Sequence, residues 1–543
     1  MFHAHFRTKL APGKLESAYL AHPVPIRVAG RRYGHGRESE ESACKVTTAT
    51  PADKMLAPFA CNRCKQRKGK CDKALPQCGH CRRNGGKCEY PSGLRPSNAH
   101  SSLIALQAQQ RVVQQPFPPS FFLDMNIFRQ ARLELPRPSL AVPAYVSDFL
   151  GGDEEVRQMV TTFFSNVYAY MPCISKTWIY QHLLSPLTPV HADSTLLLLS
   201  MQLINWTPTA SESPKSPPYI AAKQFFFELE NAGNLSIRLV QAGIFIALYE
   251  LGHCIYPAAY MSVGTCARHA VALGLDKDIK QSNATGLPWD DIEERRRVWW
   301  AILILDRFIN LGNPPRMLAT ADPATGDILP ADDASWEQGL LHATELFTIG
   351  SQSQLRMGRF ARFAQATYLL GQVIRHVSDE PRDDAFYVQE AAQLNRTLHA
   401  LIHLSQSEAE TRSLEFCTQT AACYIALLLL EQSSSSEKMK APVGSQSLSY
   451  PMVDPGVIAR ESARMSQNFL PGGTIPLPTV SPFIMHLLYQ SCIVLSSLPE
   501  EPAVDNAASL ATLQEALRVL TQRWLASGEY TSLLAARKLM SDI

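Results

Sequence analysis

The sequence predicts a mainly α-helical protein, in which a small cysteine-rich module near the N-terminus precedes a large all-helical domain, with a disordered N-terminus and linkers. Six of the thirteen cysteines fall between Cys61 and Cys88 in a repeated spacing. From about residue 150 onward, long apolar-periodic segments alternate with polar loops and show little strand-like alternation. The 543 residues are 46% hydrophobic and 18% charged, a balance typical of a folded chain with a large core.

Composition along the chain predicts four parts. The first is rich in Gly, Pro, Ser, Arg and His and is expected to be disordered, and the third is polar and proline-rich, as linkers are. The parts are residues 1–54 (disordered segment), 55–95 (cysteine module), 96–145 (linker) and 146–543 (helical domain). Because Met55 lies just before the first cysteine of the module, the sequence leaves open whether translation starts at Met1 or Met55.

The linker contains one helix-compatible stretch, residues 101–115. Its heptad-spaced positions are Leu103, Leu106, Gln110 and Val113. A coiled coil needs three or four heptads, and fewer than two clean ones are present here. The sequence therefore leaves monomer, homodimer and heterodimer open.

The helical domain is predicted from segments with helical periodicity. They are residues 156–170, 195–204, 221–232, 236–252, 258–273, 290–310, 414–432, 483–497 and 508–524. The serine run 433–436 is expected to mark a loop. Residues 298–305 are apolar nearly all round, which predicts a buried helix.

The segment EERRRVWW, from Glu293 to Trp300, is interpreted as structural and not as a ligand site. We expect Trp299 and Trp300 to pack in the core and the three arginines to lie on the helix surface. Glu293 and Arg297 are spaced i,i+4, and such a pair contributes about 0.2–0.5 kcal/mol on an exposed helix.

What the sequence lacks excludes a membrane-spanning protein and leaves an enzyme of the helical region as a distant third hypothesis. The longest uncharged apolar stretch, residues 421–430, is half of the roughly 20 residues that a membrane-spanning helix needs. No G-x-S-x-G, Walker loop, H-E-x-x-H or G-x-G-x-x-G stands in a fitting context, so we expect no enzyme.

Positive charge is concentrated in the cysteine module. Residues 61–90 hold nine basic and two acidic side chains, a formal charge of +7 against +2 for the whole chain. A compact cationic unit of this kind is typical of proteins that bind a phosphate backbone. We therefore expect nucleic acid as a partner.

The cysteines form a C-x2-C-x6-C unit that occurs twice, seventeen residues apart. The two units are Cys61, Cys64 and Cys71, and Cys78, Cys81 and Cys88. Structural zinc takes four tetrahedral ligands, and thiolates are its usual partners. Six thiolates can satisfy two zinc ions if two of them bridge, and one bridge from each unit respects the symmetry of the repeat. The spacing therefore predicts two zinc ions per module.

Three alternatives remain open at this point. Cys61, Cys64, Cys78 and Cys81 alone resemble a one-zinc finger of the nuclear-receptor type, although Cys71 and Cys88 are then unexplained. A redox role for either C-x2-C is disfavoured because no βαβ pattern surrounds it. A metal store, or a zinc-bearing interaction scaffold that does not itself bind DNA, is the alternative from a different functional class.

The stretch CNRCKQRKGKCDKALPQCGHCRRNGGKCEY resembles the fungal binuclear zinc cluster transcription factors. The resemblance rests on the cysteine spacing, the basic run after Cys64, Asp72 after the third cysteine and Pro76 two residues before the fourth. It implies that Cys61 and Cys78 bridge the two ions, that the other four cysteines are terminal ligands, and that a loop containing Pro76 joins the halves.

The resemblance also implies how the module reads DNA. We expect a short helix over residues 63–68, ended by Gly69 in a left-handed conformation. Lys68, with Arg67 beside it, is implied to reach base edges of a CGG triplet, where guanine offers O6 and N7 as acceptors. The predicted phosphate contacts, which position the module without reading sequence, are Lys65, Lys70, Arg82 and Arg83.

Stretches of the helical region, clearest in residues 266–276, 293–316 and 327–330, resemble the fungal-specific regulatory domain. The resemblance implies a nuclear, sequence-specific transcription factor of the RNA polymerase II type that works with the transcription machinery and responds to a small-molecule effector. Family members often control nutrient use or secondary-metabolite gene clusters, and residues 163–275 look more like the latter group.

Overall fold

The structure is a computed structural model of residues 1–543. The described residues are 60–74, 76–89, 117–136, 140–185, 190–207, 212–278, 280, 288–338, 346–351, 357–379, 385–412, 418–440, 454–499 and 505–541. The predictions of a disordered N-terminus, of an alternative start at Met55 and of a heptad segment over residues 101–115 lie outside the described residues.

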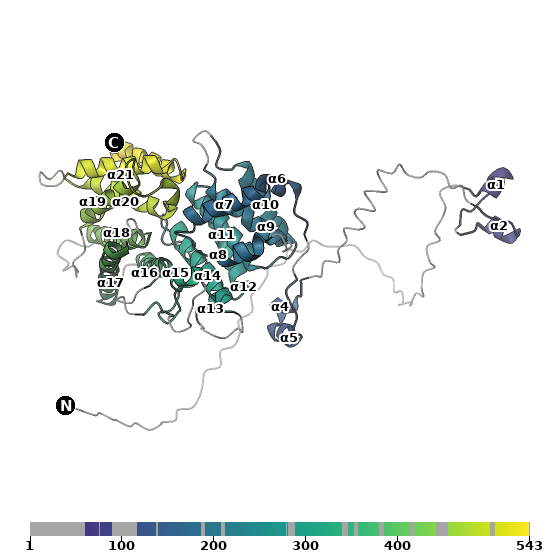
Figure 1. The fold of residues 1–543 in the computed structure, drawn as a ribbon, viewed down its shortest axis with the longest axis horizontal. Helices are drawn as coiled ribbons and strands as arrows, with labels where there is room; N and C mark the ends of the chain where they lie inside the picture. Colours follow the sequence, from purple (N-terminus) through teal and green to yellow (C-terminus); the bar gives the residue numbers. More distant parts are fainter. Residues whose placement is uncertain are drawn as a thin grey trace, which may run out of the picture. The chain divides into compact units, whose positions relative to one another are not determined.

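The chain separates into two compact units, one within residues 1–106 and the other within residues 107–543 (Figure 1). The described part of the first unit is the cysteine module, with helices α1 (Asn62–Gln66) and α2 (Gly79–Arg83). The described part of the second unit is helical apart from one antiparallel bridge between Ile328 and Thr348. The mainly α-helical fold class predicted from the sequence is therefore confirmed.

The helical unit begins with two short helices, α4 (Ser120–Leu123) and α5 (Met125–Gln130). Its first half then contains α6 (Ala144–Leu150), α7 (Asp153–Asn166), α8 (Lys176–Trp178), the π-helical turn η1 (Ile179–Leu183), α9 (Ala192–Asn205), α10 (Pro217–Asn231), α11 (Ile237–Gly252), α12 (Ala258–Ala272), α13 (Leu275–Asp278) and α14 (Trp289–Ile309).

Its second half contains α15 (Asp333–Glu337), α16 (Arg359–Ser378), α17 (Ala385–Arg412), α18 (Thr418–Lys440), α19 (Pro455–Ser466), α20 (Met485–Ser497), α21 (Asn506–Leu520) and α22 (Ala526–Ser541). The 3-10 turns η2 (Gln467–Phe469), η3 (Leu477–Thr479) and η4 (Pro482–Ile484) lie between α19 and α20. Each of the nine predicted segments overlaps a helix, and residues 414–417 of the seventh lie outside the described residues.

Local chemistry explains where the helices begin and end. α7 starts with Asp153, Glu154 and Glu155, whose charges suit the positive end of the helix dipole. α18 continues to Lys440, through the serine run that was expected to form a loop. Serine is only mildly unfavourable inside a helix, and extending an existing helix costs less than starting one. The prediction of a loop over residues 433–436 was therefore wrong.

α14 connects the two halves of the helical unit. It packs against α11, α12 and α13 in the first half and against α16 in the second. Figure 1 shows the first half in blue and teal and the second in green and yellow. The C-terminal helix α22 contacts α11 of the first half. One continuous hydrophobic core runs through both halves. No helix in the described ranges has the length and apolarity to cross a membrane.

The prediction for residues 298–305 is confirmed, because all eight are buried, Trp299 and Trp300 among them. The prediction for the arginines was wrong at two positions, since Arg296 and Arg297 are fully buried and not on the helix surface. Both contact Glu293, which is itself fully buried.

The Glu293–Arg297 pair belongs to a network that reaches beyond α14. Glu293 Oε1 accepts from Arg297 Nε at 2.9 Å and from the backbone N–H of Ala331 at 2.7 Å. Arg297 also donates to the Asp333 carboxylate at 2.9 Å and to the carbonyl of Ala331 at 2.8 Å. The 0.2–0.5 kcal/mol expected for an exposed pair does not apply to Glu293 and Arg297, because both are buried. Breaking a buried pair costs about 3–5 kcal/mol.

Candidate metal centre and nucleic-acid interface

Each half of the cysteine module starts with a cysteine at the N-cap of a one-turn helix. Cys61 precedes α1 and Cys78 precedes α2, both with extended backbone. Three residues later Cys64 and Cys81 lie on the first helical turn, which places each C-x2-C pair on one side of its helix. The backbone N–H of Cys81 donates to Cys78 Sγ at 3.4 Å.

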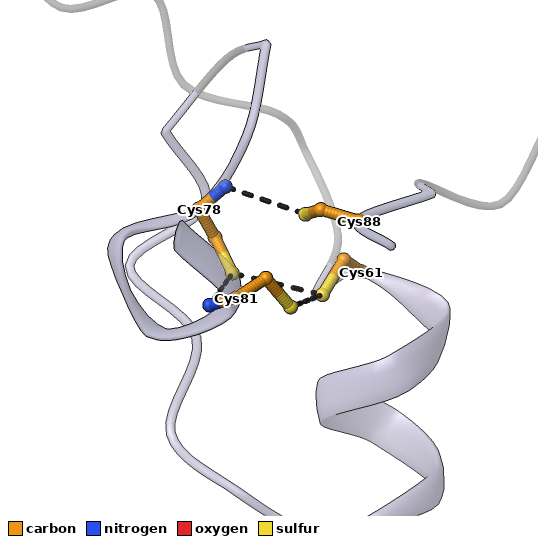
Figure 2. Close-up of side chains that lie close together, drawn as sticks. All are labelled: Cys61, Cys78, Cys81 and Cys88. Carbon is orange, nitrogen blue, oxygen red and sulfur yellow. Dashed lines mark hydrogen bonds between the residues drawn. The ribbon is translucent and has the colours of Figure 1, made fainter. Parts of the chain in front are cut away.

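The six thiols form two overlapping groups. Within each group the sulfur atoms all lie within 4.8 Å of one another, and the members are Cys61, Cys64, Cys71 and Cys78 in one group and Cys61, Cys78, Cys81 and Cys88 in the other. Cys61 and Cys78 belong to both. Figure 2 shows the second group, in which the sulfurs of Cys61 and Cys81 point toward each other and Cys88 faces the backbone N–H of Cys78.

The distances between the sulfur atoms match those expected around a tetrahedral zinc ion. Cys61 Sγ and Cys78 Sγ are 3.7 Å apart, and Cys64 Sγ and Cys78 Sγ are also 3.7 Å apart. A tetrahedron with zinc–sulfur bonds of about 2.3 Å has sulfur–sulfur edges of roughly 3.8 Å. Cys71 and Cys88, which a one-zinc finger leaves unexplained, lie with the other four.

Within residues 60–74 and 76–89, the module has no apolar core apart from these thiols. Among the described residues, the buried cluster consists of Cys61, Cys64, Cys78 and Cys81, and only Cys71 and Cys88 pack against it. Burial raises the pKa of the Cys64 thiol and raises that of Cys81 to about 12. Metal binding therefore has to displace protons, and it supplies the stabilisation that apolar burial cannot.

Asp72 links the two halves, a contact that the sequence interpretation missed. Both of its carboxylate oxygens accept from the backbone N–H of Gly79 at 2.9 Å, and this hydrogen bonding lowers the pKa of Asp72. A Cβ at position 79 would lie 2.5 Å from Asp72 Oδ2. Glycine at the start of α2 therefore lets the carboxylate approach. Pro76 lies in the intervening loop, as the resemblance implies.

The end of α1 differs from the prediction. The helix spans Asn62–Gln66, and the left-handed residue is Lys68, with φ of 49°, and not Gly69. The N–H of Gly69 donates to the carbonyl of Cys64 at 2.9 Å, and that of Lys68 to Lys65 at 3.3 Å, the pattern of a Schellman motif. The prediction was wrong because it placed the left-handed conformation at the nearest glycine. Aligning the two repeats would have paired Lys68 with Gly85, which is also left-handed.

The six basic residues predicted to contact DNA are all exposed: Lys65, Arg67, Lys68, Lys70, Arg82 and Arg83. None of them forms a side-chain salt bridge with a residue that the structure describes. Two other cations of the module are engaged, since Lys87 pairs with Glu89 at 2.7 Å and the Arg63 guanidinium fills the space where a Cβ on Gly86 would lie. The six free cations remain available to a polyanion.

The geometry defines a class of protein in which a cationic module that can hold zinc precedes a large helical domain along the chain. Comparison with known proteins agrees. The fungal Zn(2)-Cys(6) binuclear cluster domain matches residues 59–97, and the fungal specific transcription factor domain matches residues 160–434. The chain belongs to the fungal Zn(2)-Cys(6) transcription factors. Family membership indicates a DNA-binding transcription regulator and not an enzyme.

Three relatives illustrate the range of matches. Transcription factor BOA15 of Botryotinia fuckeliana is 35% identical over 179 residues, which are 33% of this chain and 98% of BOA15. The arabinolytic transcriptional activator araR of Emericella nidulans is 42% identical over 64 residues, 12% of this chain and 8% of araR. The pigment biosynthesis transcriptional activator pigB of Monascus ruber is 24% identical over 341 residues, 53% of this chain and 57% of pigB.

Membership also establishes the cofactor. The matched cluster domain binds two zinc ions through six cysteines, and the described module holds six cysteines between residues 61 and 88. Family membership also indicates that the partners of this chain include DNA and the transcription machinery.

Proposed function

We propose that the chain is a nuclear, sequence-specific transcription factor that recognises CGG-containing sites. In this proposal Cys61 and Cys78 are the bridging thiolates and the other four cysteines bind one ion each. The bridging assignment is supported by one observation, that the two four-thiol groups share Cys61 and Cys78 and no other residue. Bound zinc would supply charge and rigid tetrahedral coordination, so that the two one-turn helices hold a fixed relation to each other.

Lys68 is the proposed base-reading residue, with Arg67 beside it. The left-handed backbone at Lys68 turns the chain away from the end of α1, and its side chain is exposed. A lysine ammonium there can donate to guanine O6 and N7 in the major groove. Lys65, Lys70, Arg82 and Arg83 are the proposed phosphate contacts, because they are exposed cations without a partner in the described module.

The experiment compares duplexes that contain CGG triplets with scrambled duplexes of equal length, over a range of salt concentrations. We expect the zinc-loaded chain to prefer the CGG duplexes and its affinity to fall steeply as salt rises. Equal affinity for both duplexes would exclude CGG recognition. An affinity for neither would favour the alternative, a zinc-bearing scaffold that does not bind DNA itself.

The regulated genes are proposed to belong to a secondary-metabolite cluster. The match to the pigment biosynthesis activator extends over half of this chain, whereas the match to the arabinolytic activator covers 12% of it. Nutrient genes are therefore the second candidate. Genomic occupancy mapping in the source organism separates the two, because it returns the sites, their spacing and the neighbouring genes.

Three further features of the protein are proposed. A three-base-pair site gives little specificity, so we propose that the chain acts as a homodimer or heterodimer, with the linker setting the half-site spacing. We propose that the helical domain responds to a small-molecule effector. The proposed domain boundaries are residues 1–54, 55–95, 96–145 and 146–543.

A further inference from the structure

Residues from both halves of the helical unit line a cavity of about 200 Å³. In the first half, the end of α11 supplies Leu251 and the end of α14 supplies Phe308. In the second half, η4 supplies Phe483, α20 supplies His486 and α22 supplies Tyr530. These segments are remote from one another in sequence, so the cavity forms only where the two halves pack together.

The cavity is large enough for a small organic molecule and is open to solvent. Tyr256 and Leu533 line it and are each 49% exposed, whereas Phe483 and Met485 are buried, so the cavity runs from the surface into the core. An engineered apolar cavity of roughly 150 Å³ stays free of water and binds benzene. An unfilled apolar cavity also lowers the stability of a protein in proportion to its volume. A molecule of one or two rings would therefore fit this cavity and stabilise the fold.

Two pairs of aromatic rings line the cavity. The ring centres of Phe308 and Phe483 are 4.5 Å apart, with 48° between the ring planes. Those of His486 and Tyr530 are 6.1 Å apart, with 68° between the planes. Aromatic rings favour offset or edge-to-face contacts with further rings. A rigid planar molecule makes such contacts without losing rotation about its bonds, whereas a flexible chain of the same size loses it on binding. The lining therefore favours an aromatic ligand over an aliphatic one.

The lining offers no positive charge to a ligand. Burial lowers the pKa of His486 to about 4, so its imidazole is neutral at pH 7. Burial raises the pKa of the Cys254 thiol, which is therefore neutral as well. Of the described residues that line the cavity, Glu529 is the one that carries a charge at pH 7, and it is exposed. An anionic ligand would therefore bury its charge without a partner among these residues, which is strongly unfavourable.

We propose that this cavity binds a small neutral aromatic molecule of one or two fused rings, which packs against Phe308, Phe483 and Tyr530. Binding at this site does not depend on DNA recognition. That the bound molecule is the effector of the helical domain rests on the proposed function, to which the cavity gives a site and a chemical class of ligand. Because α22 contacts α11 and both helices line the cavity, a bound molecule stabilises the contact between the two halves.

The test uses the full zinc-loaded chain and three compounds. They are neutral 2-naphthamide, the anionic 2-naphthoate, which has nearly the same shape, and neutral 1-pyrenecarboxamide, whose ring system is larger. In equilibrium dialysis at pH 7 we expect 2-naphthamide to saturate one site per chain. We expect the other two to bind about tenfold more weakly or less, one because of its charge and the other because of its size. The proposal is overturned if 2-naphthamide does not saturate, or if either of the other compounds binds as tightly.

Paired variants in α22 localise the site. Ala526→Leu places a larger side chain at a buried position of the lining, and its control is Ala535→Leu, at an exposed position of the same helix. Leu533→Glu places a charge where the cavity opens, and its control is Leu539→Glu, which does not line the cavity. We expect 2-naphthamide affinity to fall about tenfold in Ala526→Leu and about threefold in Leu533→Glu, and to stay unchanged in the controls. Wild-type affinity in both Ala526→Leu and Leu533→Glu would overturn the proposal.

Leu533→Glu keeps the test decisive if Ala526→Leu fails to fold, because the Leu533 side chain is half exposed and is not part of the buried core. DNA binding is measured on the same protein without added compound, so that the two proposals are tested separately. A chain that binds 2-naphthamide but no duplex contradicts the proposed DNA recognition alone. A chain that binds CGG duplexes but not 2-naphthamide contradicts the cavity proposal alone.

Discussion

Lys68 and Gly85 occupy equivalent positions in the two halves of the cysteine module, seventeen residues apart, and both have a left-handed backbone, with φ of 49° and 58°. In each half the N–H of the following residue closes the helix, from Gly69 to Cys64 at 2.9 Å and from Gly86 to Cys81 at 3.1 Å. Glycine adopts this conformation freely, whereas a side chain makes it unfavourable by about 1–2 kcal/mol. One half thus places a lysine where the other has a glycine, and that lysine is the proposed base-reading residue.

The left-handed backbone at Lys68 predicts that this lysine lowers the stability of the module while it enables recognition of CGG duplexes. Lys68→Gly should stabilise the zinc-loaded module by about 1 kcal/mol while abolishing the preference for CGG duplexes. Competition for zinc with a chelator measures the first effect, and duplex binding measures the second. Lys70→Gly, at a position without a left-handed backbone, is the control and should give no stabilisation. A lower zinc affinity in the Lys68→Gly variant would contradict this prediction.

Lys68→Ala and Arg82→Ala should separate base reading from phosphate binding. Lys68→Ala keeps a side chain at the left-handed position, so its expected effect is a loss of about 1–3 kcal/mol on CGG duplexes with little change on scrambled DNA. Arg82→Ala should weaken binding to all sequences alike and reduce the slope of affinity against salt. Fluorescence anisotropy at several salt concentrations measures both. Equal losses on cognate and scrambled duplexes for both variants would refute the two roles.

Cys61→Ala should unfold the module, because Cys61 belongs to both thiol groups and the described module has no other core. We expect fewer than two zinc ions per chain and no DNA binding. Zinc content by mass spectrometry under native conditions gives the readout. Cys254→Ala, in the helical unit, is the control and should retain two ions. Two ions still bound in Cys61→Ala would contradict the bridging role.

The stability of the helical unit should fall as the pH drops below 6.5. Burial lowers the pKa of His253 to about 3 and that of His486 to about 4. Between pH 6.5 and these values the unfolded chain binds protons that the folded chain does not, so each histidine removes stability as the pH falls. The loss between pH 8 and pH 5 is on the order of 2 kcal/mol for each.

Urea unfolding followed by tryptophan fluorescence measures this effect, because all seven tryptophans lie at or beyond residue 178. His253→Gln should lose about half of the pH dependence, and His182→Gln, an exposed position, should keep it. A pH dependence that is unchanged in His253→Gln would show that other groups cause it.

Glu293→Gln should destabilise the helical unit by about 3–5 kcal/mol. The change leaves the buried Arg296 and Arg297 without their shared carboxylate. The matched control is Glu515→Gln, which removes an exposed pair with Arg518 at 2.6 Å and should cost less than about 1 kcal/mol. Equal midpoints for the two variants in urea unfolding would show that the buried network is not structurally important.

Much of the fold follows from local patterns. Helical periodicity identified nine of the longer helices, since burying one face of a helix requires apolar residues at that spacing, but α16, α17, α19 and α22 were not among the predicted segments. It misplaced the end of α18 and assigned Arg296 and Arg297 to the surface. Their burial depends on Glu293 together with Ala331 and Asp333, which lie more than thirty residues further along the chain. Partners so distant in sequence cannot be predicted from the pattern of neighbouring residues.

The amino-acid sequence by itself determined the number and spacing of the thiols, the concentration of positive charge around them and the helical character of the rest, because each of these is a property of neighbouring residues. Only the tertiary structure decided how closely the six thiols lie together, that Lys68 and not Gly69 is left-handed, and that Arg296 and Arg297 are buried. These depend on which distant atoms the folded chain brings within a few ångströms. Residue spacing constrains such distances only over a few helical turns, so packing between remote segments settles them.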